Sequence, residues 1–408
     1  MINKKRWSKK HTKIATSIAV VLIIIIIAIL YFLSPNAKLK RLGYSKYDID
    51  LINENVSEKN IKEIINHEYV AVVANFINDD NYAEKNIIRY IDYYIKNNKV
   101  KLKDIVHIVN GNADNYDYSD FLLDCVVDEN YVYLNVDRYI NYHNEYENAP
   151  ARETIILVNS EIEKPYTDKL GAIINEGYFI VNNTERYINY ADSHPKTSSA
   201  NVVAIVNSST DRNQYTVNNN VDFSKGNNIL VNKYYKLSSS YNNPVAKDVP
   251  SEISDGNIKL EAQTLSAIEE LIDNARDNGY NIVVKRGYLN YTELSNLYYS
   301  YSRNNGEWYA DSYLGKAGYS EYQTGFAVAL AVRGDSIENF GNTAAFRWVQ
   351  ANAHKYGFIL RYPKGKEYLT GYAYMPFHFR YVGKETANQI KESGLTFDEY
   401  YAYYIENH

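Results

Sequence analysis

An uncharged apolar run near the N-terminus places the first constraint on how this chain folds. Residues 14–33 read IATSIAVVLIIIIIAILYFL, and about 20 apolar residues are the length that a helix needs to cross the hydrocarbon core of a bilayer. Residues 1–13 are strongly basic, which favours a cytoplasmic tail by the positive-inside rule. No small-residue cleavage site follows directly. The run is therefore predicted to be an uncleaved single-pass anchor in the cell membrane, with the rest of the chain outside the cell.

Composition narrows the class of protein. The 408-residue chain is 45% hydrophobic and 23% charged, which predicts folded domains with buried cores. Its net charge of −5, without a Lys/Arg-rich face, argues against a nucleic-acid partner. The single cysteine, Cys125, excludes an internal disulfide framework and is expected to be buried, which suits a Gram-positive bacterial surface. The 43 tyrosines are assigned to codon usage, with a sugar-binding aromatic surface as the alternative.

Residues 34–67 are predicted to form a helical segment. Ser45 and Ser57 each precede a stretch with apolar residues at helical spacing and acidic residues in its first turn. Both serines are therefore predicted to be helix N-caps.

A repeat of about 49 residues occupies residues 68–237. Each copy carries an Asn-x-x-Arg-Tyr motif and, further on, an apolar run that ends in Val-Asn. The three motifs begin at Asn86, Asn135 and Asn183, and the three runs end at Asn110, Asn159 and Asn207. The motif is predicted to start a helix with its asparagine as N-cap, and the apolar run to be a buried strand. Residues 228–237 are expected to close the array as a last strand.

Such repeats bury together what one copy cannot bury alone. No loop carries a recurring charged or catalytic cluster, so the array is interpreted as a spacer, with a dedicated binding array as the alternative. Residues 238–257, rich in Ser, Asn, Pro and Asp, are predicted to be a linker. Residues 258–408 mix helical patterns with irregularly spaced strands, which predicts an α+β domain.

Three motifs in this last domain resemble a known family. They are RGYLNY around Tyr288, SEYQTGFAVAL from residue 320, and NAHKYGFILRYPKGKEYLTGYAYMPFHFRYVG from residue 352. Over residues 258–405 the chain resembles the VanY-type D-alanyl-D-alanine carboxypeptidases of the LAS metallopeptidase group. LKRLGYS from residue 39 onward in the chain's helical segment and LVNKYYKL before the linker also resemble the accessory region that precedes this domain. The resemblance implies the family's fold and a site for peptidoglycan peptides.

The same resemblance implies that the zinc chemistry is lost. The family holds zinc through His, Asp and a second His, and a Glu serves as general base. Those positions fall on Tyr322, Ala329 and His378 for the ligands and on Met375 for the base. Alanine has no donor atom and methionine cannot accept a proton, while three ligands are standard for catalytic zinc. No bound zinc is therefore expected, and only His378 is retained from the ligand set.

Nearby groups are not expected to replace the lost ligands. Glu321 belongs to the family's usual loop and is expected to point away from the metal position. Asp335 is expected in a turn, and His354 is expected to be a hydrogen-bonded structural histidine. The family's substrate-facing Arg and Gln fall on Leu289 and Leu294. The remodelled cleft is predicted to be apolar and aromatic, with these lining residues: Arg286, Tyr288, Leu289, Leu294, Tyr322, Gln323, Met375, Phe377, His378 and Arg380.

The leading hypothesis is a membrane-anchored extracellular pseudopeptidase that binds cell-wall stem peptide or an envelope protein. One alternative is an active zinc D-alanyl-D-alanine carboxypeptidase that recruits non-standard ligands around His378. Another makes the repeats the functional part and the C-terminal domain a passive cap.

Overall fold

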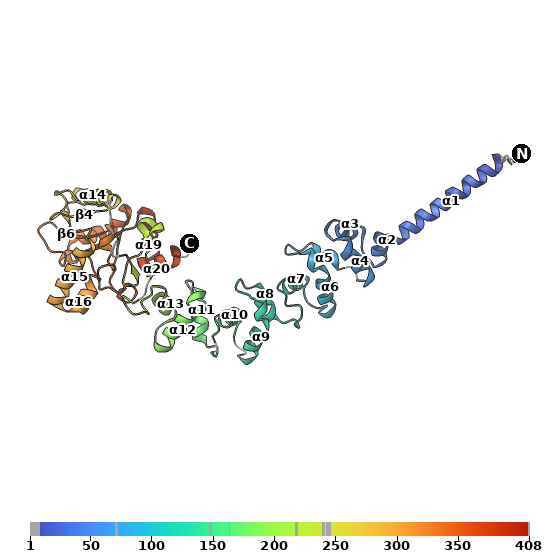
Figure 1. Ribbon diagram of the computed structural model, residues 1–408, viewed down its shortest axis with the longest axis horizontal. Helices are drawn as coiled ribbons and strands as arrows, with labels where there is room; N and C mark the ends of the chain where they lie inside the picture. The colour runs from blue at the N-terminus through green and yellow to red at the C-terminus, as the bar shows by residue number, and fades with distance from the viewer. Residues whose placement is uncertain are drawn as a thin grey trace. The chain divides into compact units, whose positions relative to one another are not determined.

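The computed structural model describes residues 9–69, 72–146, 149–162, 164–216, 219–238, 241 and 246–406 (Figure 1). Most of the predicted basic tail, residues 1–8, lies outside the described residues, as do 239–240 and 242–245 of the predicted linker. The chain divides into two compact units, Met1–Thr167 and Asp168–His408. Each unit has its own packing and is described by itself.

Helix α1 (Lys9–Leu33) opens the first unit. Its segment Lys13–Leu33 has a mean hydropathy of 3.0, and none of the most apolar window is buried against other residues. By length and composition it is a candidate membrane span. A signal sequence near an N-terminus meets the same criteria.

The predicted helical segment contains α2 (Pro35–Arg41), α3 (Lys46–Asn55) and α4 (Glu58–Asn66). Ser45 caps α3: its hydroxyl accepts from the amide of Asp48 at 3.2 Å, and the Asp48 carboxylate accepts from the amide of Ser45 at 2.9 Å. Ser57 accepts from the amide of Asn60 at 3.4 Å and caps α4. Both predicted N-caps are present, because a serine hydroxyl satisfies an amide that has no partner inside the helix.

Among the described residues, each predicted repeat consists of helices joined by turns. A short helix is followed by a 3-10 turn, a longer helix that carries the Asn-x-x-Arg-Tyr motif, and a nine-residue helix. In order, the helices are α5 (Val73–Ile77), α6 (Ile87–Lys96) and α7 (Leu102–Asn110); α8 (Asp120–Val127), α9 (Val136–Glu145) and α10 (Ala151–Asn159); α11 (Asp168–Ile174), α12 (Thr184–Ser193) and α13 (Ser199–Asn207). The 3-10 turns are η1 (Glu84–Asn86), η2 (Tyr133–Asn135) and η3 (Val181–Asn183).

The prediction of a strand in each repeat is therefore wrong: the three apolar runs form α7, α10 and α13. In α10 the residues Ala151 and 153–158 are buried and cover most of the helix circumference, since α10 packs against both α8 and α9. A short helix that is apolar nearly all round has the same sequence pattern as a strand buried on both faces. The pattern alone could not separate the two.

The two sequence marks of the repeat meet in one hydrogen-bond network. The amide of the motif asparagine donates to the side-chain oxygen of the asparagine that ends the nine-residue helix, and the motif tyrosine hydroxyl donates to the same oxygen. The first contact measures 2.9 Å for Asn86–Asn110, 2.9 Å for Asn135–Asn159 and 3.1 Å for Asn183–Asn207. The tyrosine donors are Tyr90, Tyr139 and Tyr187.

The motif asparagines precede their helices but make no side-chain cap hydrogen bond, contrary to the N-cap prediction. Their amides instead join the two helices of each copy. Buried amides must find partners, so these contacts specify how the two helices pack.

The C-terminal domain is built on a four-stranded antiparallel sheet in the order β5–β6–β8–β7. The strands are β5 (Ile282–Arg286), β6 (Ala327–Val332), β7 (Phe358–Leu360) and β8 (His378–Tyr381). One core joins the sheet to α14 (Ala262–Asp277) and α17 (Ala344–Asn352) through Ile268, Leu271, Val328, Val349 and Phe379. The predicted α+β class is confirmed.

Shorter elements complete this domain. The helices are α15 (Tyr291–Asn305), α16 (Glu307–Tyr313), α18 (Glu367–Thr370), α19 (Lys384–Ser393) and α20 (Phe397–Tyr404), with 3-10 turns η4 (Phe223–Asn228), η5 (Glu321–Thr324), η6 (Phe340–Asn342) and η7 (Ala353–Tyr356). Two-residue strands pair as β1 (Asn219–Asn220) with β2 (Tyr235–Lys236) and β3 (Lys247–Asp248) with β4 (Lys259–Leu260). Helices α15 and α16 pack together at one edge of the domain (Figure 1).

The segment predicted to close the repeat array is instead part of the C-terminal domain. Only Tyr235–Lys236 of it is strand. The Arg380 guanidinium donates to the carbonyls of Asn227 and Ile229 at 2.8 and 2.9 Å, and Lys233 Nζ donates to the carbonyl of Gly371 at 2.6 Å. These polar contacts tie the segment down because both cations are fully buried and need oxygen partners.

The second half of the predicted linker also packs. Val249 and Ile253 are buried in the core of the C-terminal domain, and β3 pairs with β4 across residues 247–260. Polar composition around Pro250 marks turns here, and these turns belong to the folded unit.

Candidate functional site

Three of the predicted site residues form a row across the sheet. Arg286 on β5 pairs with Ala329 on β6, and Ala329 pairs with His378 on β8. A bulge between Val284 and Arg286 sets this register. Because paired residues on neighbouring antiparallel strands point to the same face, the three side chains lie side by side.

Tyr322 lies next to this row. It belongs to η5, which ends at Gly325 in the left-handed conformation with φ of 74°, where a glycine is favoured. The Tyr322 ring centre is 4.9 Å from the His378 ring centre. The guanidinium carbon of Arg286 is 5.5 Å from the same Tyr322 ring centre. Its hydroxyl is buried and has no hydrogen-bond partner among the described residues. Burial raises the pKa of Tyr322 to about 12, against the opposing charge of Arg286.

His378 is held among rings and one carboxylate. The Tyr362 ring centre is also 4.9 Å away, and Oε2 of Glu321 is 3.6 Å from Nε2, too long for a hydrogen bond. Burial lowers the pKa of His378, and Glu321 opposes this only in part. The imidazole is therefore expected to be neutral at neutral pH.

A buried charge network adjoins His378 and was not predicted from the sequence. Nε of Arg361 donates to Glu321 Oε1 at 2.7 Å, and its two Nη atoms donate to Asp398 at 2.5 and 3.1 Å. Asn232 donates to Asp398 at 2.8 Å. Burial alone would raise the pKa of Glu321, but Arg361, His378 and Arg380 together outweigh burial and hold that pKa at about 2.

Glu321 was expected to point away from the metal position, and its partner was not identified. Arg361 and Asp398 lie 37 residues apart, and nothing local in either stretch indicates that they pair. The available signal was a charge inside the apolar run FILRY, which predicts a buried cation in need of a partner.

The position that the resemblance assigns to the general base is occupied by packed side chains. Met375 clusters with Tyr362 and Tyr372, whose ring centres are 4.7 Å apart, and half-buried Tyr313 and Phe377 pack against them. A thioether in this setting contributes packing and no proton transfer. Tyr322, Met375 and His378 are only 2%, 1% and 3% exposed.

The positions that the resemblance assigns to the substrate-facing groups are also packed. Leu294 is fully buried with Tyr298, Leu314 and Ala327, and Leu289 lies at the edge of that cluster. Gln323 and Arg380, predicted to line the cleft, are fully buried. The Gln323 side-chain oxygen accepts from the amide of Gly318. An open cleft does not extend to these side chains, because apolar replacements pack against one another and exclude water.

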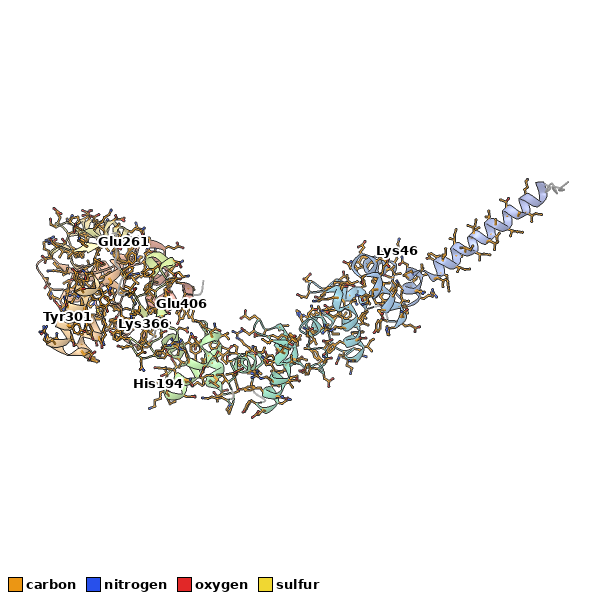
Figure 2. The ribbon with its side chains drawn as sticks, viewed as in Figure 1. Lys46, His194, Glu261, Tyr301, Lys366 and Glu406 are labelled. Atoms are coloured by element: carbon orange, nitrogen blue, oxygen red, sulfur yellow. The ribbon has the colours of Figure 1, made fainter. Side chains whose placement is uncertain are left out.

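An open groove remains beside the row. Its volume is about 660 Å³, and three predicted site residues, Arg286, Tyr288 and Leu289, line it. Tyr301 on α15 stands near Arg286 and accepts from its Nη2 at 3.5 Å; Figure 2 labels this tyrosine.

The residues at the site do not fit a zinc ion. His378 supplies one imidazole, Ala329 no donor and Met375 no base, and Glu321 is already bound to Arg361. Within the described part of the chain, no group of three His, Cys, Asp or Glu side chains is placed to hold a metal. Asp335 lies in a surface turn, where it accepts from Asn339 and Ser336.

His354 departs from its expected role. Its Nδ1 is buried and has no hydrogen-bond partner among the residues that the structure describes, so the expected hydrogen bond is not found at that atom. The ring lies in η7 beside a small cavity of about 240 Å³ that Phe358, Leu360 and Lys391 also line.

Comparison with known proteins covers the C-terminal part of the chain. Residues 257–384 match the family model "VanY: D-alanyl-D-alanine carboxypeptidase". The chain is 37% identical to the putative carboxypeptidase YodJ of Bacillus subtilis, over 42% of this chain and 66% of that protein. It is 30% identical to the bifunctional D-Ala-D-Ala dipeptidase and D-Ala-D-Ala carboxypeptidase VanXYC of Enterococcus gallinarum, over 43% of this chain and 93% of that protein.

Among solved structures, the LdcB LD-carboxypeptidase is 33% identical, covers 47% of this chain and 94% of its own, and superposes with a TM-score of 0.43. The chain spans just under two thirds of the length of the Bacillus relative, 66%. Sequence identity across nearly the whole Enterococcus gallinarum relative, together with the family match, shows that the chain belongs to the VanY family of D-alanyl-D-alanine carboxypeptidases.

Proposed function

We propose that this protein is a membrane-anchored extracellular pseudopeptidase, whose VanY-family domain binds a cell-wall stem peptide without cleaving it and has lost the family's zinc. The carrying observation is the residue set at the reacting centre: Tyr322, Ala329 and Met375 stand where the family's chemistry requires two zinc ligands and a base, and the tyrosine and methionine are packed.

Peptide hydrolysis needs an activated water and a group that moves its proton. Met375 accepts no proton, and the phenol of Tyr322, with a pKa of about 12, stays protonated at neutral pH. His378 and Glu321 are closer to a working pair, but both are buried. A substrate carbonyl would have to displace packed rings to reach them.

Two observations support a stem peptide as the proposed ligand. The Enterococcus gallinarum relative is named for its action on D-Ala-D-Ala, so a peptide of that kind is the natural candidate. The groove of about 660 Å³ has the volume of an ordinary ligand site, and Arg286, Tyr288 and Leu289 line it. An envelope protein that presents a peptide end to this groove is the other partner that the proposal admits.

The rest of the chain supports an extracellular, wall-facing role. Helix α1 is proposed to be the membrane anchor, which leaves the C-terminal domain on the outer side of a Gram-positive membrane. The helical repeats are proposed to act as a spacer between the anchor and the domain.

The test compares full-length protein in detergent with the Enterococcus gallinarum relative. Both are equilibrated with zinc, gel-filtered and analysed for metal, then incubated with a stem peptide that ends in D-Ala-D-Ala. We expect the relative to retain zinc and to release D-alanine. This protein should bind the intact peptide in calorimetry, release no D-alanine and retain no stoichiometric zinc.

One zinc per chain together with release of D-alanine would establish the alternative, an active carboxypeptidase with non-standard ligands. Failure to bind the peptide would refute the proposed ligand. A variant that combines Tyr322→His, Ala329→Asp and Met375→Glu should gain zinc, and no gain would mean that these positions are not the family's ligand and base positions.

A further inference from the structure

Arg286 is a cation without an acidic partner. Its Nη2 makes one long hydrogen bond, 3.5 Å to the Tyr301 hydroxyl, and the groups that act on its charge are Tyr322 and Tyr301. In the described residues no ion pair joins Arg286 to an aspartate or glutamate. The other two arginines of this sheet region have more acceptors: Arg361 binds two carboxylates, and Arg380 binds two carbonyls and a threonine hydroxyl, with only its Nε lacking a partner among the described residues.

The surroundings of Arg286 make its lack of hydrogen-bond acceptors energetically unfavourable. The side chain is half-buried and lies against the Tyr322 ring. A guanidinium carries five N–H donors, and removing them from water without acceptors is unfavourable. The two tyrosines offset part of this cost, but neither supplies a negative charge that neutralises the guanidinium.

The other charges that line the groove are already committed. Lys285 pairs with Asp255. The Glu293 carboxylate accepts from the amide of Asn290 at 2.8 Å and closes the capping box of α15. Arg286 is therefore the charged side chain of this groove that remains available to a ligand.

We infer that Arg286 is the receptor for a free carboxylate, the C-terminal carboxylate of the peptide that occupies this groove. The inference rests on the proposed function for its peptide and adds the group that is recognised. A planar guanidinium binds a carboxylate through two parallel hydrogen bonds, which fixes the peptide end in one orientation. Leu289 and Leu297 line the same groove and offer apolar contact to the terminal side chain.

The test uses two synthetic stem peptides that differ only at the C-terminus, one with a free carboxylate and one with a carboxamide. Calorimetry on the full-length protein in detergent should show that the acid peptide binds at least about tenfold more tightly than the carboxamide peptide. The carboxamide lacks the negative charge and so loses the charge-assisted hydrogen bonds to Arg286. Arg286→Gln should abolish this preference. Arg286→Lys keeps the charge without the planar fork and should retain part of it. Lys285→Gln, the matched neighbour, should keep the preference whatever its overall affinity.

The outcomes separate the two proposals. Equal binding of acid and amide by the unaltered protein would overturn the carboxylate receptor and leave peptide binding intact. An equal loss of both peptides in Arg286→Gln, with the preference unchanged, would assign Arg286 a structural role and also overturn it. Binding of neither peptide by the unaltered protein would refute the proposed function and this inference together. Thermal unfolding of each variant shows whether it is folded. If Arg286→Gln does not fold, Arg286→Lys tests the proposed carboxylate receptor in its place.

Discussion

Two groups of residues meet at His378 and differ in how their charges are handled. In the first, Glu321, Arg361 and Asp398 are buried and every charge has a partner. The second group is the row of Arg286, Ala329 and His378 together with the neighbouring Tyr322. Its single charge, Arg286, has no acidic partner among the described residues. Glu321, Arg361 and Asp398 are at most 1% exposed, whereas Arg286 is half-buried, so burial accounts for part of the difference.

The two groups also differ in how much stability the fold loses when one of their residues is replaced. A buried carboxylate that loses its cation is left uncompensated, so no member of the first group can change alone without a large loss of stability. In the proposed function, the second group occupies positions where the family carries its chemistry, and alanine there adds no charge that needs a partner. We therefore expect the fold to depend on the first group and to tolerate replacement of the second.

The largest expected effect comes from breaking the first group. Arg361→Met leaves Glu321 and Asp398 buried without their shared cation and should cost about 3–5 kcal/mol of unfolding free energy. Urea unfolding of the full-length protein measures the cost. The control is Arg276→Met on α14, which breaks an exposed pair with Asp273 and should cost at most about 1 kcal/mol. Similar losses in the two variants would mean that the buried network carries no special weight.

Acid should weaken the same network in a defined pH range. The pKa of Glu321 is about 2 in the folded protein and near its ordinary 4.5 when unfolded, so its ionised form stabilises the fold above pH 4.5. That contribution is lost as the pH falls from about 4.5 toward 2. Glu321→Gln should therefore be less stable than the unaltered protein at pH 7, and the gap should narrow in this range.

Urea midpoints at pH 7, 5, 4 and 3 measure this gap. Asp335→Asn, which removes a carboxylate from a surface turn, is the matched control and should show a much smaller gap at every pH. A gap for Glu321→Gln that does not change with pH would show that its ionisation does not stabilise the fold.

Part of the site could be predicted from the sequence because its motifs resemble those of a known family. The loop SEYQTG and the strand after it carry Tyr322 and Ala329, and the register brings both beside His378 as expected. The strand prediction for the run that ends at Asn159 failed because a helix buried nearly all round and a strand buried on both faces share one pattern. There the tertiary environment decided the element.

The rest depends on contacts between distant residues. The pairing of Arg361 with Asp398 has no local signal, and neither has the docking of Asn232 on Asp398 across 166 residues. The cleft was predicted to be apolar and aromatic, but apolar side chains that can reach one another pack, and Leu294 and Met375 are packed. Whether a changed site stays open is a property of packing, which one sequence does not state.

The smallest expected effect tests the second group. Tyr322→Phe removes a buried hydroxyl that has no partner among the described residues, so it should change the unfolding free energy by less than about 1 kcal/mol and in the stabilising direction. Tyr187→Phe in the third repeat is the matched control in the same compact unit. The Tyr187 hydroxyl donates to Asn207 and accepts from the amide of Ile180 at 3.1 Å, so its loss should cost about 1–3 kcal/mol. Urea unfolding measures both. A loss at Tyr322 as large as that at Tyr187 would mean that its hydroxyl holds a bound group in solution, and a packed, chemically silent site would then be the wrong description.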